Sequence, residues 1–98
     1  MNIRLIRNIY HHSPKTGLTS ITVFKDYKWD VPPVIGATVD DSAWHRNDTT
    51  YIASININAE EGDVYYVELN SKEVEEVEHV KKLAEVSMLH GWDNLYKR

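Results

Sequence analysis

The chain has 98 residues, of which 42% are hydrophobic and 27% are charged, and it contains no cysteine. This length suits one domain, and the composition is that of a soluble globular protein rather than a disordered one. The lack of cysteine excludes disulfide frameworks, thiolate nucleophiles and cysteine-ligated zinc or iron–sulfur sites. The formal net charge is −4, so the chain lacks the basic excess that most nucleic-acid-binding surfaces need.

Neither a membrane span nor a secretion signal is predicted. No apolar run approaches the ~20 residues that a membrane-spanning helix needs. Residues 1–8 interrupt their apolar positions with Asn and Arg too often to form the core of a signal peptide. We therefore expect a cytoplasmic protein that does not contact membranes.

The first third of the chain predicts a β-hairpin. Residues 2–10 and 18–29 are rich in β-branched and aromatic side chains, which is typical of strands. Pro14 and Gly17 mark a turn between them. Because the connection is short, we expect the two strands to pair in antiparallel fashion.

The next segment is predicted to be mostly irregular. Pro32 and Pro33 end the second strand, because proline cannot donate to a sheet. Residues 34–39 form a short apolar run that predicts a third strand, and Gly36 within it suggests a bulge. Residues 40–48 then form a polar loop, where binding residues tend to lie.

The clearest strand signal lies at 50–58, where apolar and polar residues alternate with Ile52 as the exception. Residues 59–63 form a turn and 64–69 return as the partner strand, which predicts a second hairpin.

A helix is predicted over 71–90. Asn70 and Glu73 have the spacing of a capping box, and Gly91 is a favourable residue after the helix end. An apolar stripe runs along this segment and consists of Val74, Val77, Val80, Ala84 and Met88. Three large apolar residues in the tail, 91–98, predict that it packs against the domain.

Together these elements predict an α+β fold in a single domain spanning 1–98. The sheet has about five antiparallel strands and is strongly curved or forms a half-open barrel. The C-terminal amphipathic helix packs on it, since one apolar stripe needs one sheet face to cover it.

The polar loop at 40–48 is the predicted interaction site. Its candidate contact residues are Asp40, Asp41, Trp44, His45 and Arg46, and the turn at 11–16 is a candidate to extend this surface. Tryptophan is enriched in binding hot spots, and Trp44 lies in a polar loop, flanked by Ala43, His45 and Arg46. We therefore expect a small non-catalytic accessory module, without a cofactor, that recognises another protein.

Two other functions are weighed against this one. A metal-dependent enzyme would use His11, His12 and His45 as ligands together with Asp40 and Asp41. However, adjacent side chains on a strand point to opposite faces, which separates His11 from His12.

Weak binding of single-stranded nucleic acid is the other alternative. The first hairpin carries aromatic and basic side chains, the types that hold single strands: Arg4, Tyr10, Lys25, Tyr27, Lys28 and Trp29.

A homodimer is also predicted, through a sheet edge that carries neither proline nor an inward-pointing charge.

Overall fold

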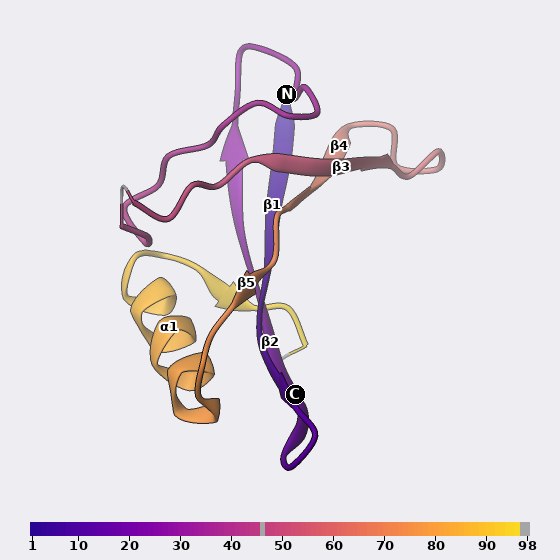
Figure 1. Ribbon diagram of the computed structural model, residues 1–98. Helices are drawn as coiled ribbons and strands as arrows, with labels where there is room; N and C mark the ends of the chain where they lie inside the picture. Colours follow the sequence, from indigo (N-terminus) through magenta and orange to yellow (C-terminus); the bar gives the residue numbers. More distant parts are fainter. Residues whose placement is uncertain (46, 97–98) are drawn as a thin grey trace.

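A computed structural model describes residues 1–45 and 47–96 (Figure 1). It contains six strands and one helix: β1 (Asn2–Ser13), β2 (Gly17–Lys28), β3 (Ile52–Ile57), β4 (Val64–Leu69), β5 (Lys72–Glu73), α1 (Val77–Leu89) and β6 (Asp93–Asn94). The α+β class, the curved open sheet and the single helix near the C-terminus confirm the predicted fold.

The strands lie in the order β3-β4-β1-β2-β6. β1 and β2 form a long antiparallel hairpin, as do the shorter β3 and β4. β4 and β5 both run parallel to β1 along its other edge, so the sheet is mixed rather than wholly antiparallel. These parallel pairs join strands that are far apart in the sequence, so no local turn pattern could reveal them.

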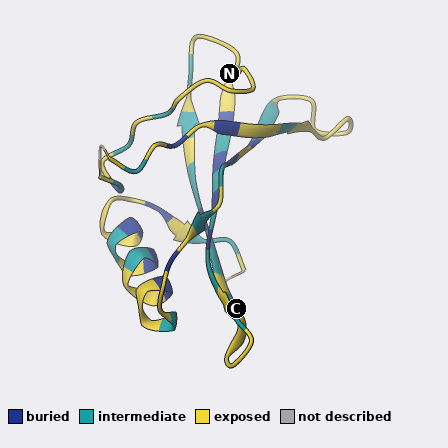
Figure 2. Cartoon of the chain, viewed as in Figure 1, coloured by how far each residue is buried: buried dark blue, intermediate teal, exposed yellow. Residues whose placement is uncertain are grey.

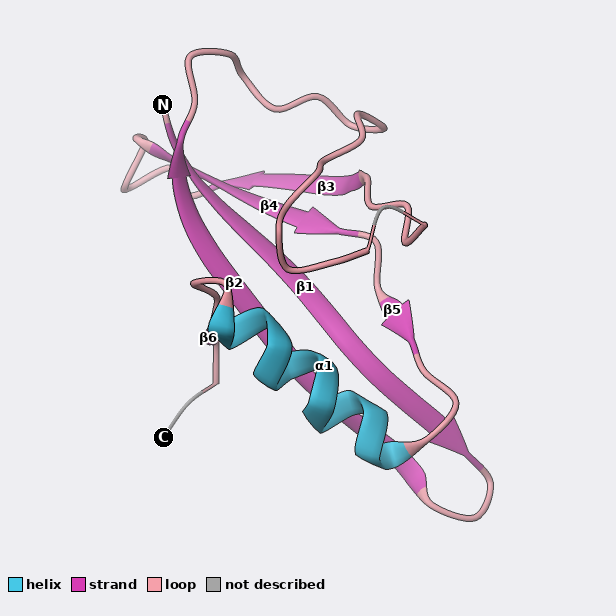
Figure 3. Ribbon diagram, turned by 90° about the vertical axis from the view of Figure 1, so that its left-hand side faces the viewer, coloured by secondary structure: helices cyan, strands magenta, loops and turns pink. Residues whose placement is uncertain are grey.

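One face of the sheet carries the core. Ile3, Leu5 and Ile9 alternate along β1 toward this face and are almost fully buried (Figure 2). Both α1 and the long connection between β2 and β3 lie in front of this face (Figure 3). The opposite face carries half-exposed side chains, among them Tyr10.

The predicted strand at 34–39 does not form. Gly36 has a φ of 89°, and the Ala37 N–H donates to the Val34 carbonyl oxygen at 3.1 Å, which makes a turn. Only Thr38 forms a bridge, to Tyr51. Residues 36–39 therefore run beside the start of β3 without joining the sheet as a strand.

The helix begins at Val77, later than the predicted start at 71. Residues 72–73 instead form β5, which pairs with Ile9 and Tyr10 at an edge of β1 that β4 does not reach. Backbone groups on that edge need partners, and this need overrides the local helical pattern. The predicted capping box is consequently absent, because Asn70 binds the segment 49–51 and Glu73 lies in a strand.

The buried stripe of α1 also differs from the prediction. Val80, Ala84 and Ser87 are its buried residues, whereas Met88 is 40% exposed. The Ser87 hydroxyl donates to the Leu83 carbonyl oxygen, which satisfies the buried polar group within the helix.

A β-bulge explains the exception at Ile52. The pairing of β3 with β4 shifts by one residue between Ile52 and Ser54, so Ala53 is the extra residue. The bulge lets Ile52 point into the core on the same side as Ile55, although the two have opposite parity.

The tail packs against the domain as predicted, over the part that the structure describes. Trp92 is 3% exposed, and β6 pairs with Val23 and Phe24 of β2. Tyr96 is exposed, and residues 97–98 lie outside the described part. In the described ranges we find no helix with the length and apolar character needed to cross a bilayer.

Candidate functional site

The predicted interaction loop, 40–48, is fastened to the core by two carboxylates. The first is Asp41, whose side chain is 2% exposed. Its Oδ1 accepts hydrogen bonds from the Trp92 indole N–H at 3.0 Å and from the Ala43 backbone N–H at 2.9 Å. The Tyr27 hydroxyl donates to its Oδ2. Asp41 thus joins the loop to β2 and to the C-terminal tail.

The charge of Asp41 is stabilised despite its burial. Burial by itself would raise the pKa of this carboxyl, but the hydrogen bonds from Tyr27, Trp92 and Ala43 hold the pKa below its ordinary value. The Lys25 ammonium, 3.8 Å from Oδ2, adds to this effect. Lys25 also donates to the His90 carbonyl oxygen at the end of α1, which neutralises that helix terminus.

The second carboxylate is Asp48, which binds the buried Arg7 of β1 in a two-pronged ion pair. Both distances between guanidinium nitrogens and carboxylate oxygens are 2.9 Å. Arg7 is 4% exposed, and its Nε donates to the Asn70 carbonyl oxygen where β4 ends. Trp44 covers the guanidinium at 5.0 Å from its ring centroid.

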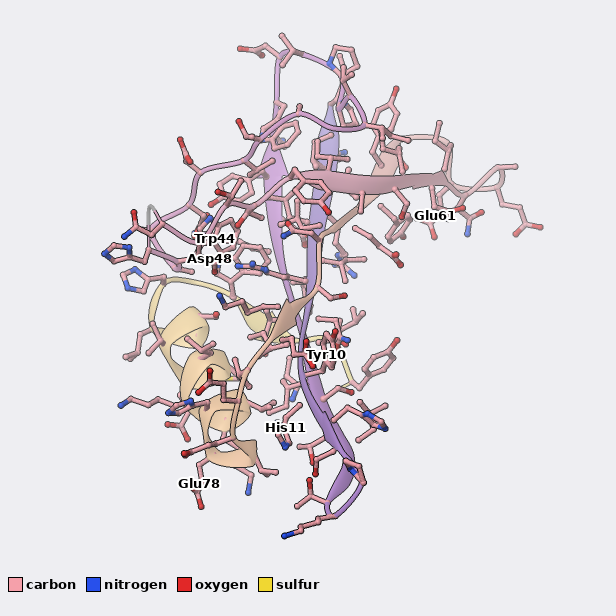
Figure 4. The ribbon with its side chains drawn as sticks, viewed as in Figure 1. Tyr10, His11, Trp44, Asp48, Glu61 and Glu78 are labelled. Carbon is pink, nitrogen blue, oxygen red and sulfur yellow. The ribbon has the colours of Figure 1, made fainter. Side chains whose placement is uncertain are left out.

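These contacts orient Asp41, Trp44 and Asp48 inward. Trp44 packs on Trp92 with ring centroids 5.2 Å apart and its indole N–H donates to the Val39 carbonyl oxygen. Figure 4 shows Trp44 beside Asp48, on the opposite side of β1 from Tyr10. Trp44 and Asp41 therefore act in the packing of the loop.

Of the other predicted contact residues, Asp40 and His45 are exposed and Arg46 lies outside the described residues. The His45 Nδ1 accepts the Asn47 backbone N–H at 3.1 Å, as in a local turn. The exposed residues in the described part of this loop are all polar: Asp40, Ser42, His45 and Asn47.

The histidines are held in separate places. The Nδ1 of His11 donates to the Val74 carbonyl oxygen at 2.9 Å, while His12 follows it on β1 and is exposed. His45 belongs to the loop that Asp48 fastens. Over the described ranges, no three His, Asp or Glu side chains gather so that they could hold a metal ion.

Three basic residues of the first hairpin, Arg4, Arg7 and Lys25, lie within ion-pair distance of carboxylates. Arg4 binds Asp26 through two hydrogen bonds of 2.8 and 3.0 Å, and its guanidinium lies 4.3 Å from the centroid of the Phe24 ring. Arg4 lowers the pKa of Asp26. Because their charges are already balanced, these residues offer little to a phosphate backbone.

The free edge of β3 is a further candidate that the sequence indicated only in general terms. β3 is the last strand at its end of the sheet. Residues 36–39 cover its outer edge only as far as Ile52, through bonds between Gly36 and the Ile52 carbonyl and between the Ile52 N–H and Ala37. In the part of the chain that the structure describes, no strand covers 53–57, the segment that we call the free edge.

The free edge lies in a stretch without charge. Residues 49–59 contain no charged residue, no proline and no glycine. Most natural edges are protected by such residues, and an unprotected edge is a template for another strand. The sequence alone shows that 49–59 lacks charge, proline and glycine, but it does not show that β3 is the strand at the end of the sheet.

Exposed apolar side chains flank the free edge. Ile57 is 56% exposed at its far end, and Ile35 and Val34 are 64% and 61% exposed beside its beginning. An open groove of about 690 Å³ continues from there between Ile52 and the segment 28–34. An apolar surface of this kind on a small protein is typical of an interaction site.

Comparisons with protein-family models, with curated proteins and with solved structures give no significant match to this chain.

Proposed function

We propose that this protein is a non-catalytic binding module that recognises another polypeptide by adding it as a strand to the free edge of β3. The observation that carries the proposal is an edge without charge or proline at 53–57, at the outer end of the sheet. Strand addition takes its affinity from backbone hydrogen bonds and its specificity from pockets for alternate side chains.

The surroundings of the edge suit such a ligand. Side chains of an added strand on the core side would meet Ile55 and the exposed Ile57. On the other side they would meet Ser54 and Asn56, which can form hydrogen bonds. The ligand we expect is therefore an extended segment of alternating apolar and small polar residues.

This site replaces the loop at 40–48 as the proposed surface. The two best anchors of that loop, Asp41 and Trp44, are occupied by contacts within the protein. The β2 edge, toward the other end of the sheet, is a weaker candidate. It is interrupted by β6 at Val23 and Phe24 and carries charges at 25, 26 and 28.

Selection from a library of random peptides, followed by hydrogen–deuterium exchange, tests the proposal. Selected peptides should show an apolar–polar alternation, and their binding should slow exchange at 53–57 while exchange at 18–21 of β2 stays unchanged. Slowed exchange at β2 or α1 without change at 53–57 would contradict the proposal, and so would failure to select any peptide above background if the protein itself is monomeric.

A further inference from the structure

The free edge of β3 is complementary to itself. Its sequence, Ala-Ser-Ile-Asn-Ile, alternates apolar and polar residues symmetrically about Ile55. If two copies of this edge run antiparallel with their Ile55 residues opposite each other, each Ala53 faces Ile57 of the other copy. Each Ser54 then faces Asn56. Residues that are opposite in an antiparallel pair share a face, so apolar residues meet apolar ones and polar residues meet polar ones.

The sizes of the paired side chains also fit. Ile57 is 56% exposed and extends beyond the covered part of the sheet. Opposite it would stand Ala53, whose small side chain leaves room for it. Pairing a large residue with a small one in this way fills space without a clash.

The charge of the protein does not oppose this pairing at the edge. The whole chain has a formal net charge of −4, which disfavours contact between copies at most surfaces. The segment 49–59 is free of charge, so the two edges can approach without repulsion between directly opposite residues.

The length of the free edge fixes the register. Residues 36–39 cover β3 up to Ile52, and β3 ends at Ile57. Centring the pair on Ile55 pairs the regular residues 54–56 directly and places Ile57 opposite Ala53, the extra residue of the bulge. A shift of the centre to Asn56 would leave Ala53 unpaired and would require Asn58, which lies beyond the strand.

We propose that the strand which occupies the free edge of β3 is the β3 of a second copy, paired antiparallel about Ile55. The two sheets then form one continuous sheet with both α1 helices on the same side, because a two-fold axis between antiparallel strands is perpendicular to the sheet. This inference rests on the proposed function and specifies its partner.

Introducing like charges at Ser54 and Asn56, which face each other in the proposed pair, tests the register. The variant S54K/N56K places lysines opposite lysines in a dimer, and S54E/N56E does the same with glutamates. Both side chains face away from the core and Ser54 makes one hydrogen bond, to Glu68 at 3.2 Å, so the fold should tolerate the changes. Circular dichroism and the melting temperature check that it does.

Sedimentation equilibrium and native mass spectrometry give the outcome. We expect the wild type to be a dimer, each variant alone to dissociate about tenfold more readily, and a mixture of the two variants to form a mixed dimer. A matched control, Glu78→Lys with Lys82→Glu on the exposed side of α1, should dimerise like the wild type.

A monomeric wild type at high concentration would overturn the inference, and so would a dimer that both charged variants retain.

Because the natural chain has no cysteine, Ile55→Cys adds an independent readout. Oxidation should link two copies of Ile55→Cys far more readily than two copies of Asn58→Cys. If the wild type is monomeric but selected peptides protect 53–57, the proposed function stands and the partner is a different protein. If no peptide protects 53–57 either, both proposals fail.

Discussion

Asp48 illustrates how a single buried pair can position a long irregular segment. Its carboxylate meets the guanidinium of Arg7, which is 4% exposed, so removing either partner would leave a buried charge without a counter-charge. The pair also brings the loop against the point where β4 ends, since Arg7 binds the Asn70 carbonyl. The fixed position of the loop therefore depends on this contact.

Replacing Asp48 with Ala should lower the free energy of unfolding by about 3 kcal/mol, because the buried guanidinium of Arg7 loses its counter-charge. Asp40→Ala is the matched control in the same loop, and we expect a change within about 0.5 kcal/mol because Asp40 is exposed. Urea denaturation measures both. Equal stability of the two variants would show that the ion pair does not hold the loop.

Asp41 should make stability depend on pH. Its pKa is lower in the folded protein than in the unfolded chain, so its contribution is present above the unfolded pKa of about 4 and is lost as the pH falls through the folded value. Asp48, whose pKa is lowered by Arg7 against the effect of burial, acts in the same direction.

We therefore expect the free energy of unfolding to decrease below about pH 4 and the decrease to be shallower in Asp41→Asn. Urea titrations between pH 2.5 and about pH 6 measure it. Asp40→Asn, with an exposed side chain, is the control and should keep the slope of the wild type. An unchanged slope in Asp41→Asn would argue against a stabilised charge at this position.

At the scale of elements, the strands followed from the sequence better than the helix start did. The content of β-branched and aromatic residues located β1 and β2, alternation located β3, and the turn after it located β4, all of which are signals in the local sequence. The structure of the region 70–76 could not be predicted in this way, because β5 forms only where β1 extends beyond β4. Pairing with β1 involves residues far away in the chain, and the local spacing of Asn70 and Glu73 does not indicate it.

The later start of α1 leaves its first turn without a side-chain cap. Glu76 occupies the N-cap position with an extended backbone and makes no capping hydrogen bond. Glu76→Ser should raise the free energy of unfolding by about 0.5–1 kcal/mol, since a serine hydroxyl there can accept from the free backbone N–H groups. Thermal denaturation measures the gain. Glu75→Ser one residue earlier is the control, and an equal gain there would contradict the observed helix start.

At the scale of the whole molecule, the covered face explains why the loop at 40–48, predicted to be an interaction surface, turns Asp41 and Trp44 inward. Its composition is polar, and polar loops are usually exposed. Here Asp41 and Trp44 instead meet Trp92, which arrives from the C-terminal tail. A tryptophan in a polar segment does not reveal its partner, because that partner comes from the other end of the sequence.

This convergence predicts an energetic coupling between the loop and the tail. Trp92→Phe keeps an aromatic ring in the buried site but removes the N–H that donates to Asp41 at 3.0 Å. Losing a hydrogen bond to a buried carboxylate should cost about 1–3 kcal/mol of unfolding free energy.

Asp41→Asn should also be destabilising, and the two changes together should cost less than the sum of each alone, with a coupling energy above about 0.5 kcal/mol. A cycle of Trp92→Phe with Asp40→Asn supplies the control, since Asp40 is exposed and the Trp92 indole N–H binds Asp41 instead, so the effects should be additive. Additivity in both cycles would mean that the loop and the tail pack independently on the sheet.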